Sequence, residues 1–186
     1  MTENRFNYCP DCGSRNIQTK NNGRKWLCPD CGLELYNNVA AAVGVILQND
    51  KGEILFEKRA KEPAKGKLAL PGGFLEPGER AESGAVRECR EETGVEIDGL
   101  DFLCSFPNTY EYKGLVYKTC DLFFTARLPE NCRLKAEESE VSGFVWLKLE
   151  TPADVEKAPL AFPSAVETLK FFLREPGFKL TLNKNH

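Results

Sequence analysis

The stretch GGFLEPGERAESGAVRECREETGV, residues 72–95, joins a glycine- and proline-rich loop to a segment with helical periodicity. Small or apolar residues at positions 81, 85, 86 and 89 form one stripe at helical spacing, which predicts a helix from about Arg80 to Thr93. Gly94 follows, and glycine readily takes the positive φ angle that ends many helices. The stretch therefore predicts an irregular loop that leads directly into one amphipathic helix.

The predicted helix carries three glutamates on one face. Glu88, Glu91 and Glu92 stand at i, i+3 and i+4, where like charges repel by roughly 0.2–0.5 kcal/mol per pair in an isolated helix. Three carboxylates and a nearby loop carbonyl are hard oxygen ligands, which suit Mg²⁺ or Mn²⁺ when substrate phosphates complete the coordination. A solvated helix face with Arg87 and Arg90 as partners is the alternative that these residues alone leave open.

The longer pattern decides between these two readings. From Gly73 the sequence fits G-x5-E-x7-R-E-U-x-E-E-x-G-U, where U is an apolar residue. This pattern resembles the signature of the Nudix hydrolases, and every fixed position matches, with Cys89 and Val95 at the two apolar positions. The resemblance implies an α/β fold, an α/β/α sandwich with a mixed sheet across roughly residues 38–175. It also implies hydrolysis of a nucleoside diphosphate linked to another group.

The resemblance assigns roles to the matching residues. It implies that Mg²⁺ or Mn²⁺ is bound by three carboxylates and one backbone carbonyl, those of Glu88, Glu91, Glu92 and Gly72. It further implies that Arg87 and Glu79 pair and orient the metal-binding carboxylates, as groups around a metal site commonly do. Glu91, Arg87 and Glu79 are therefore the predicted catalytic residues within the motif.

A general base is expected outside the motif. Family members often carry a glutamate in a loop before a strand that contains tryptophan, and here EESEVSGFVW, residues 137–146, offers three. We favour Glu140, then Glu138, over Glu137. A solvated acidic loop is the alternative.

Four cysteines near the N-terminus form a separate pattern. Cys9, Cys12, Cys28 and Cys31 have the spacing C-x2-C-x15-C-x2-C of a zinc ribbon. Four thiolates close a tetrahedral shell, so the predicted Zn²⁺ is structural. Two disulfides, or a ribbon that recognises nucleic acid, are the alternatives. We therefore expect a zinc ribbon at 1–36 and a Nudix hydrolase domain at 37–186.

The rest of the chain reads as strands and one further helix. Strands are predicted at 40–48, 53–59, 100–106, 110–119, 121–128 and 143–149, and an amphipathic helix at 164–175 with a stop at Pro176. Strands interrupted by two helices indicate a mixed sheet covered on both faces.

The order of ribbon and hydrolase domain resembles that of NADH pyrophosphatases, although CSFPNTYEY at 104–112 departs from the motif of that family. Phe106, Tyr110 and Tyr112 are predicted to stack a base of the substrate, with strand packing as the alternative. The expected substrate is a small-molecule nucleoside diphosphate derivative of the dinucleotide, ADP-ribose or nucleotide-sugar type. A nucleoside triphosphate pyrophosphohydrolase and a non-catalytic nucleotide sensor are the alternative functions.

Composition excludes other classes. The single histidine, His186, leaves no Ser-His-Asp triad and no three-histidine zinc site. The net charge of −3 argues against a nucleic-acid partner, and the sequence has no apolar run long enough for a membrane. MTENRFNYCP has no signal-peptide pattern, so we expect a cytoplasmic protein, with a homodimer left open.

Overall fold

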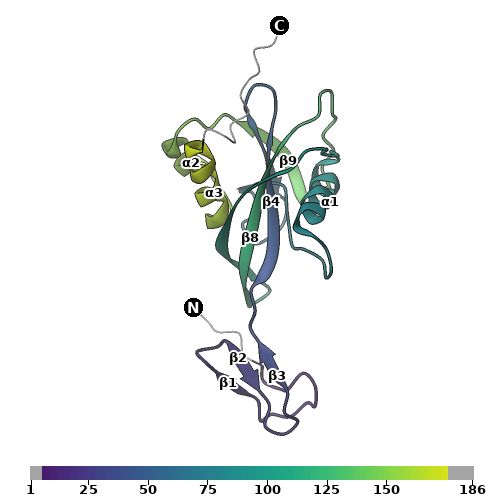
Figure 1. Cartoon of the computed structure of the whole chain (residues 1–186), viewed down its shortest axis with the longest axis vertical. Coiled ribbons are helices and arrows are strands. Elements are labelled where there is room, and N and C mark those ends of the chain that lie inside the picture. The colour runs from purple at the N-terminus through teal and green to yellow at the C-terminus, as the bar shows by residue number, and fades with distance from the viewer. Residues whose placement is uncertain (1–5, 176–186) are drawn as a thin grey trace. The chain divides into compact units, whose positions relative to one another are not determined.

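The computed structural model describes residues 6–175 of the chain. They fall into two compact units, one of residues up to 40 together with 109–118, the other of residues 41–108 together with 119 onward (Figure 1). The hairpin tip 109–118 therefore groups with the N-terminal segment. Pro176 and His186 lie outside the described residues.

The N-terminal segment forms a small antiparallel sheet. Its strands are β1 (Gln18–Lys20), β2 (Lys25–Leu27) and β3 (Glu34–Tyr36), in the order β1-β2-β3. Trp26 is buried on the central strand, and the ring of Phe6 meets it edge-on at 4.9 Å between centroids. This apolar contact is small, so the unit depends on another source of stability.

The second unit is built on a larger sheet. Its strands are β4 (Ala40–Gln48), β5 (Ile54–Arg59), β6 (Leu68–Ala69), β7 (Asp101–Tyr112), β8 (Leu115–Arg127) and β9 (Val141–Leu147). The order is β6-β5-β4-β8-β7, and β9 pairs antiparallel with β5. The N–H of Leu128, just after β8, donates to the carbonyl of Gln48 at the end of β4 (2.8 Å), so these two strands run in the same direction and the sheet is mixed.

Helices cover both faces of this sheet. Helix α1 (Ala81–Thr93) lies on one side, and α2 (Pro152–Lys157) and α3 (Pro163–Arg174) lie on the other (Figure 1). Successive side chains of β4 point to opposite faces of the sheet, so this strand supplies apolar side chains to both. Val45 packs towards α1, whereas Ile46 packs towards α3. The predicted α/β/α sandwich is therefore confirmed.

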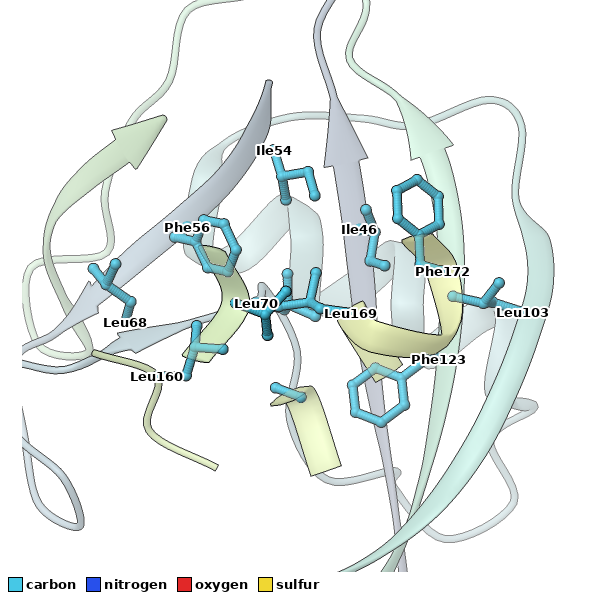
Figure 2. Close-up of a cluster of buried hydrophobic side chains, with 12 residues drawn as sticks. Ile46, Ile54, Phe56, Leu68, Leu70, Leu103, Phe123, Leu160, Leu169 and Phe172 are labelled. Atoms are coloured by element: carbon cyan, nitrogen blue, oxygen red, sulfur yellow. The ribbon is translucent and has the colours of Figure 1, made fainter. Parts of the chain in front are cut away.

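The α3 side of the sheet holds the larger of the two hydrophobic clusters. Figure 2 shows Ile46, Ile54 and Phe56 of the sheet facing Leu169 and Phe172 of α3. Each such buried side chain contributes about 1.5–3 kcal/mol of hydrophobic stabilisation. This packing holds the sheet rigid behind the face on which α1 lies.

Two features differ from the sequence predictions. The segments 100–106, 110–119 and 121–128 are instead two long strands, β7 and β8, joined at Lys113 and Gly114. Pro107 lies within β7, which is an edge strand, where proline is tolerated. Helix α2 was not predicted; its start is fixed by a capping box between Thr151 and Asp154.

The two predicted helices differ by single residues at their ends. Arg80 is the N-cap of α1, and Gly94 ends it with a φ of 73°. None of the helices within residues 6–175 is long and apolar enough to cross a membrane.

Candidate active site

The loop before α1 is held against β4 by backbone hydrogen bonds. The N–H groups of Val43 and Val45 donate to the carbonyls of Gly73 (2.8 Å) and Pro71 (2.9 Å). Gly72 has a φ of 150°, and a Cβ there would lie 2.1 Å from the Val43 carbonyl oxygen. A Cβ on Gly73 would lie 2.7 Å from Oε1 of Glu88. Gly72 is therefore required where the loop meets the backbone of β4, whereas a side chain at Gly73 would displace the carboxylate of Glu88.

Arg87 connects the loop to the glutamates. Its Nε and Nη2 donate to the two carboxylate oxygens of Glu79, each at 2.9 Å, and Nη2 also donates to the Phe74 carbonyl (3.1 Å). Its Nη1 donates to Glu88 (2.8 Å) and Glu91 (3.1 Å). Hydrogen bonding to Arg87 lowers the pKa of Glu79 to about 2, so this pair stays ionised. The arrangement fixes the side chains of Glu88 and Glu91 relative to the loop.

Glu92 lies on the inner edge of α1 and is buried. Its Oε2 accepts a hydrogen bond from the Gly72 N–H at 2.7 Å. Burial raises the pKa of Glu92 to about 8, against the lowering effect of that hydrogen bond, and the charge of Glu88 adds to the rise. Burial likewise raises the pKa of Glu88. The contact with the loop is through the Gly72 amide, whereas the sequence predicted a role for its carbonyl.

Sequence reasoning missed one carboxylate, that of Glu57 on β5. Glu57 is 3% exposed, and burial followed by the charge of Glu92 raises its pKa well above the ordinary value. The signal was present in ILFEKR, because three consecutive apolar residues indicate a strand buried on both faces. The next residue of such a strand is buried too, even when it is a glutamate.

The cluster fits divalent cations. Within the described part of the chain, Arg87 contacts the carboxylates of Glu79, Glu88 and Glu91, while Glu92 and Glu57 lie against each other beside them. Carboxylate oxygens are the ligands that Mg²⁺ and Mn²⁺ prefer, and one arginine cannot neutralise five acids. One buried oxygen, Oε1 of Glu57, is also left without a hydrogen-bond partner.

The loop before β9 adds a further carboxylate to this region. Glu140 forms an ion pair with Lys61, and its charge contributes to the raised pKa values of Glu88 and Glu92. The Glu137 N–H donates to the backbone carbonyl of Glu92 at 3.3 Å, while the side chains of Glu137 and Glu138 are exposed. The structure thus brings Glu140 near the glutamates of α1; its role as general base stays a prediction.

The aromatic residues are distributed over both units. Phe106 lies in the second unit, half-buried on β7, whereas Tyr110 and Tyr112 belong to the hairpin tip that groups with the N-terminal segment. The two tyrosine rings lie 6.3 Å apart between centroids. Their predicted contact with substrate stays a prediction.

The four N-terminal cysteines converge as a metal site requires. The Sγ atoms of Cys9, Cys12, Cys28 and Cys31 lie within 4.8 Å of one another, and two of the pairs are 3.7 Å apart. A tetrahedral Zn²⁺ with bonds of 2.3 Å would separate its sulfurs by about 3.8 Å. The cluster fits a zinc ribbon.

Comparison with curated proteins gives related sequences. The chain is 30% identical over 181 residues to a NAD-capped RNA hydrolase of Schizosaccharomyces pombe, covering 86% of this chain and 46% of that protein. It is 35% identical over 102 residues to the NAD-capped RNA hydrolase NudC of Pseudomonas aeruginosa, covering 55% of this chain and 35% of that protein. An ADP-ribose pyrophosphatase of Methanocaldococcus jannaschii is 51% identical over 61 residues, which are 33% of this chain and 36% of that protein. The chain thus spans about half or less of the length of these relatives.

Fold and family comparisons agree. A NUDIX hydrolase from Nitrosomonas europaea superposes with a TM-score of 0.66 at 24% identity, covering 91% of this chain and 92% of the other, which supports the fold. The model of the NUDIX domain matches residues 39–167, and this range contains the loop, α1 and the carboxylates described above. The resemblance seen in the sequence is confirmed: the chain belongs to the NUDIX domain family.

Proposed function

We propose that this protein is a metal-dependent pyrophosphohydrolase that cleaves the diphosphate linkage of a nucleoside diphosphate derivative. The observation that carries the proposal is the set of hydrogen bonds from Arg87. They join the carbonyl of Phe74, in the loop before α1, to three carboxylates. Preorganised charged groups of this kind stabilise charge that develops in a transition state. Family membership supplies the reaction type.

In this proposal Glu88, Glu91 and Glu92 hold Mg²⁺ or Mn²⁺. Such an ion neutralises the diphosphate and lowers the pKa of water at the site. Arg87 and Glu79 hold the glutamates in place, and the Gly72 N–H orients the carboxylate of Glu92. Glu140 is the proposed general base, with Glu138 as the next choice, because Glu140 is near the carboxylates and is less exposed.

The proposed substrate has two large groups joined by a diphosphate, as in NADH or ADP-ribose. The printed names of the relatives, NAD-capped RNA hydrolases and an ADP-ribose pyrophosphatase, support this class. Phe106, Tyr110 and Tyr112 are the proposed contacts to a base, and each aromatic pair would contribute about 0.5–1.5 kcal/mol beyond area burial. The same names favour a second candidate, NAD at the 5′ end of RNA.

The first 36 residues are proposed as a structural zinc ribbon and residues 37–186 as the catalytic domain. Structural zinc supplies about 10–16 kcal/mol of apparent binding energy in units of this size, far more than the Phe6–Trp26 contact. The cytoplasm is the proposed location, because it keeps cysteines reduced and a zinc site of four cysteines needs reduced thiols.

Steady-state kinetics tests this function. We would measure kcat/KM for NADH, ADP-ribose, a diadenosine polyphosphate, dGTP and a NAD-capped RNA oligonucleotide, with and without Mn²⁺. We expect activity only with the ion, highest on one of the diphosphate-bridged compounds, and a fall of about 10²–10³ in Glu91→Gln. Glu82→Gln, an exposed glutamate on the same helix, is the control. Preference for dGTP would indicate a triphosphate pyrophosphohydrolase, and no hydrolysis of any compound would indicate a nucleotide sensor.

A further inference from the structure

Glu57 is a carboxylate in a place where a strand normally carries an apolar residue. It shares a face of β5 with Leu55, which is fully buried in the hydrophobic cluster beneath α1. Glu57 itself is only 3% exposed, and its charge acts on the buried thiol of Cys89. The side chain therefore lies between the sheet and α1, on the side where the glutamates of the motif stand.

The immediate neighbours of Glu57 supply neither a full set of hydrogen bonds nor a compensating positive charge for its carboxyl. Its carboxyl meets that of Glu92, and Glu88 is the next charged group that acts on it. Among the described residues, its Oε1 has no hydrogen-bond partner. The charge of Arg59 lowers the pKa of Glu57, but this guanidinium has other partners. It donates to the Pro63 carbonyl at 2.7 Å and lies over the Phe162 ring at 5.0 Å. A buried polar atom without a hydrogen-bond partner destabilises the fold, and native proteins rarely leave one.

We propose that Glu57 is an additional ligand of the divalent-cation site, which it shares with Glu92 from the opposite side of the α1–sheet junction. The inference rests on the proposed function, because it assumes that the glutamates of α1 hold Mg²⁺ or Mn²⁺. A cation beside Glu92 would give Oε1 of Glu57 the partner that it lacks, and would compensate two buried acids in contact. The site then draws on a strand as well as on the helix of the motif.

The competing explanation is that Glu57 only holds Glu92 in position. The isosteric change Glu57→Gln separates the two explanations. The glutamine amide can still donate a hydrogen bond to Glu92, and it removes one of two like charges, so a positioning role would survive the change. A ligand role would not survive, because the neutral amide replaces the anionic oxygen that the cation needs.

Mn²⁺ binding measured by the electron paramagnetic resonance signal of free Mn²⁺ is the test, with the full-length protein and no substrate. We would compare wild type, Glu57→Gln, Glu91→Gln and Glu167→Gln, an exposed glutamate on α3 that serves as the matched control. We expect Glu57→Gln to weaken Mn²⁺ binding at least about tenfold, within the 10–100-fold range typical of changes around a metal site, and Glu167→Gln to bind as wild type does.

The outcomes separate the inference from the function beneath it. If Glu91→Gln weakens binding and Glu57→Gln binds like wild type, Glu57 is not a ligand and the proposed site still stands. If wild type itself does not bind Mn²⁺, the proposed function and this inference both fail. Should Glu57→Gln not fold, Glu57→Asp takes its place: it keeps the charge but draws the oxygens back by one methylene. Binding by Glu57→Asp equal to wild type would then overturn the inference.

Discussion

Replacing Glu92 by glutamine should stabilise the protein in the absence of Mg²⁺ and Mn²⁺ while it weakens cation binding. The change keeps the shape of the side chain and an oxygen that can accept the hydrogen bond from the Gly72 N–H. It removes a buried carboxyl whose pKa rises from an ordinary value of 4.5 to about 8. At about 1.4 kcal/mol per unit, that rise corresponds to roughly 5 kcal/mol of destabilisation of the ionised form.

The stability gain should depend on pH. Below about pH 4.5 the carboxyl is protonated in the folded and the unfolded chain, so the neutral glutamine changes little. Between pH 4.5 and about 8 the unfolded chain has released the proton and the folded chain has not, so the unfolding free energy of cation-free wild type falls as the pH rises. Glutamine has no such proton. The variant should therefore exceed wild type by about 3 kcal/mol at pH 7 and roughly 5 kcal/mol above pH 8.

Urea unfolding in buffer without Mg²⁺ or Mn²⁺ measures this difference. A Trp26→Phe background leaves Trp146 on β9 as the fluorescent reporter of the second unit, and dialysis without chelator leaves zinc on the cysteines. Glu82→Gln is the control and should change stability by less than about 0.5 kcal/mol at every pH. A gap between Glu92→Gln and wild type that does not vary with pH would refute the reasoning, as would a less stable variant at pH 8.

Two other predictions concern the ribbon and the loop. Protein purified without chelator should contain one zinc per chain by elemental analysis. Cys28→Ser should lose the zinc and unfold the N-terminal unit, which circular dichroism would detect. Zinc-free protein with reduced cysteines would contradict the site. Gly72→Ala should lower the melting temperature and the activity together, because its Cβ would lie 2.1 Å from the Val43 carbonyl oxygen. In the control Gly78→Ala, the Cβ meets no atom within 4 Å, so only the positive φ destabilises the variant. Equal effects of the two changes would show that the close approach is unimportant.

The sequence was sufficient for those parts of the site that are local in the chain. Gly73 to Val95 are contiguous, so the spacing of the glutamates along one helix could be read directly, and the structure places Arg87 against the acids that the motif names. The cysteine pairs could be read for the same reason, because each CxxC turn is short. A mixed sheet covered on both faces could also be expected from the strands and the two helices of the apolar pattern, and the resemblance to the family implied the α/β/α sandwich.

The parts that could not be predicted depend on which strands meet. Glu57 is 35 residues before Glu92, and the local sequence ILFEKR does not predict that this strand lies beneath α1. The gaps predicted at 107–109 and at 120 are absent because β7 and β8 are long strands, and Pro107 is tolerated because β7 lies at the sheet edge. Tyr110 and Tyr112 fall in a different unit from Phe106, a division that only the fold reveals, and their contact with substrate stays a prediction.

Glu57 and Glu92 also show why stability and cation binding should oppose each other here. Two acids that meet in a buried position destabilise the cation-free fold, and glutamine at either position would relieve the repulsion. A chain selected for stability alone would lose such a pair readily, because each single substitution is a gain. A chain that must hold a divalent cation would keep both, because the proposed ion would turn the repulsion into shared coordination. The unfavourable charges are therefore the part of this fold that most directly indicates its function.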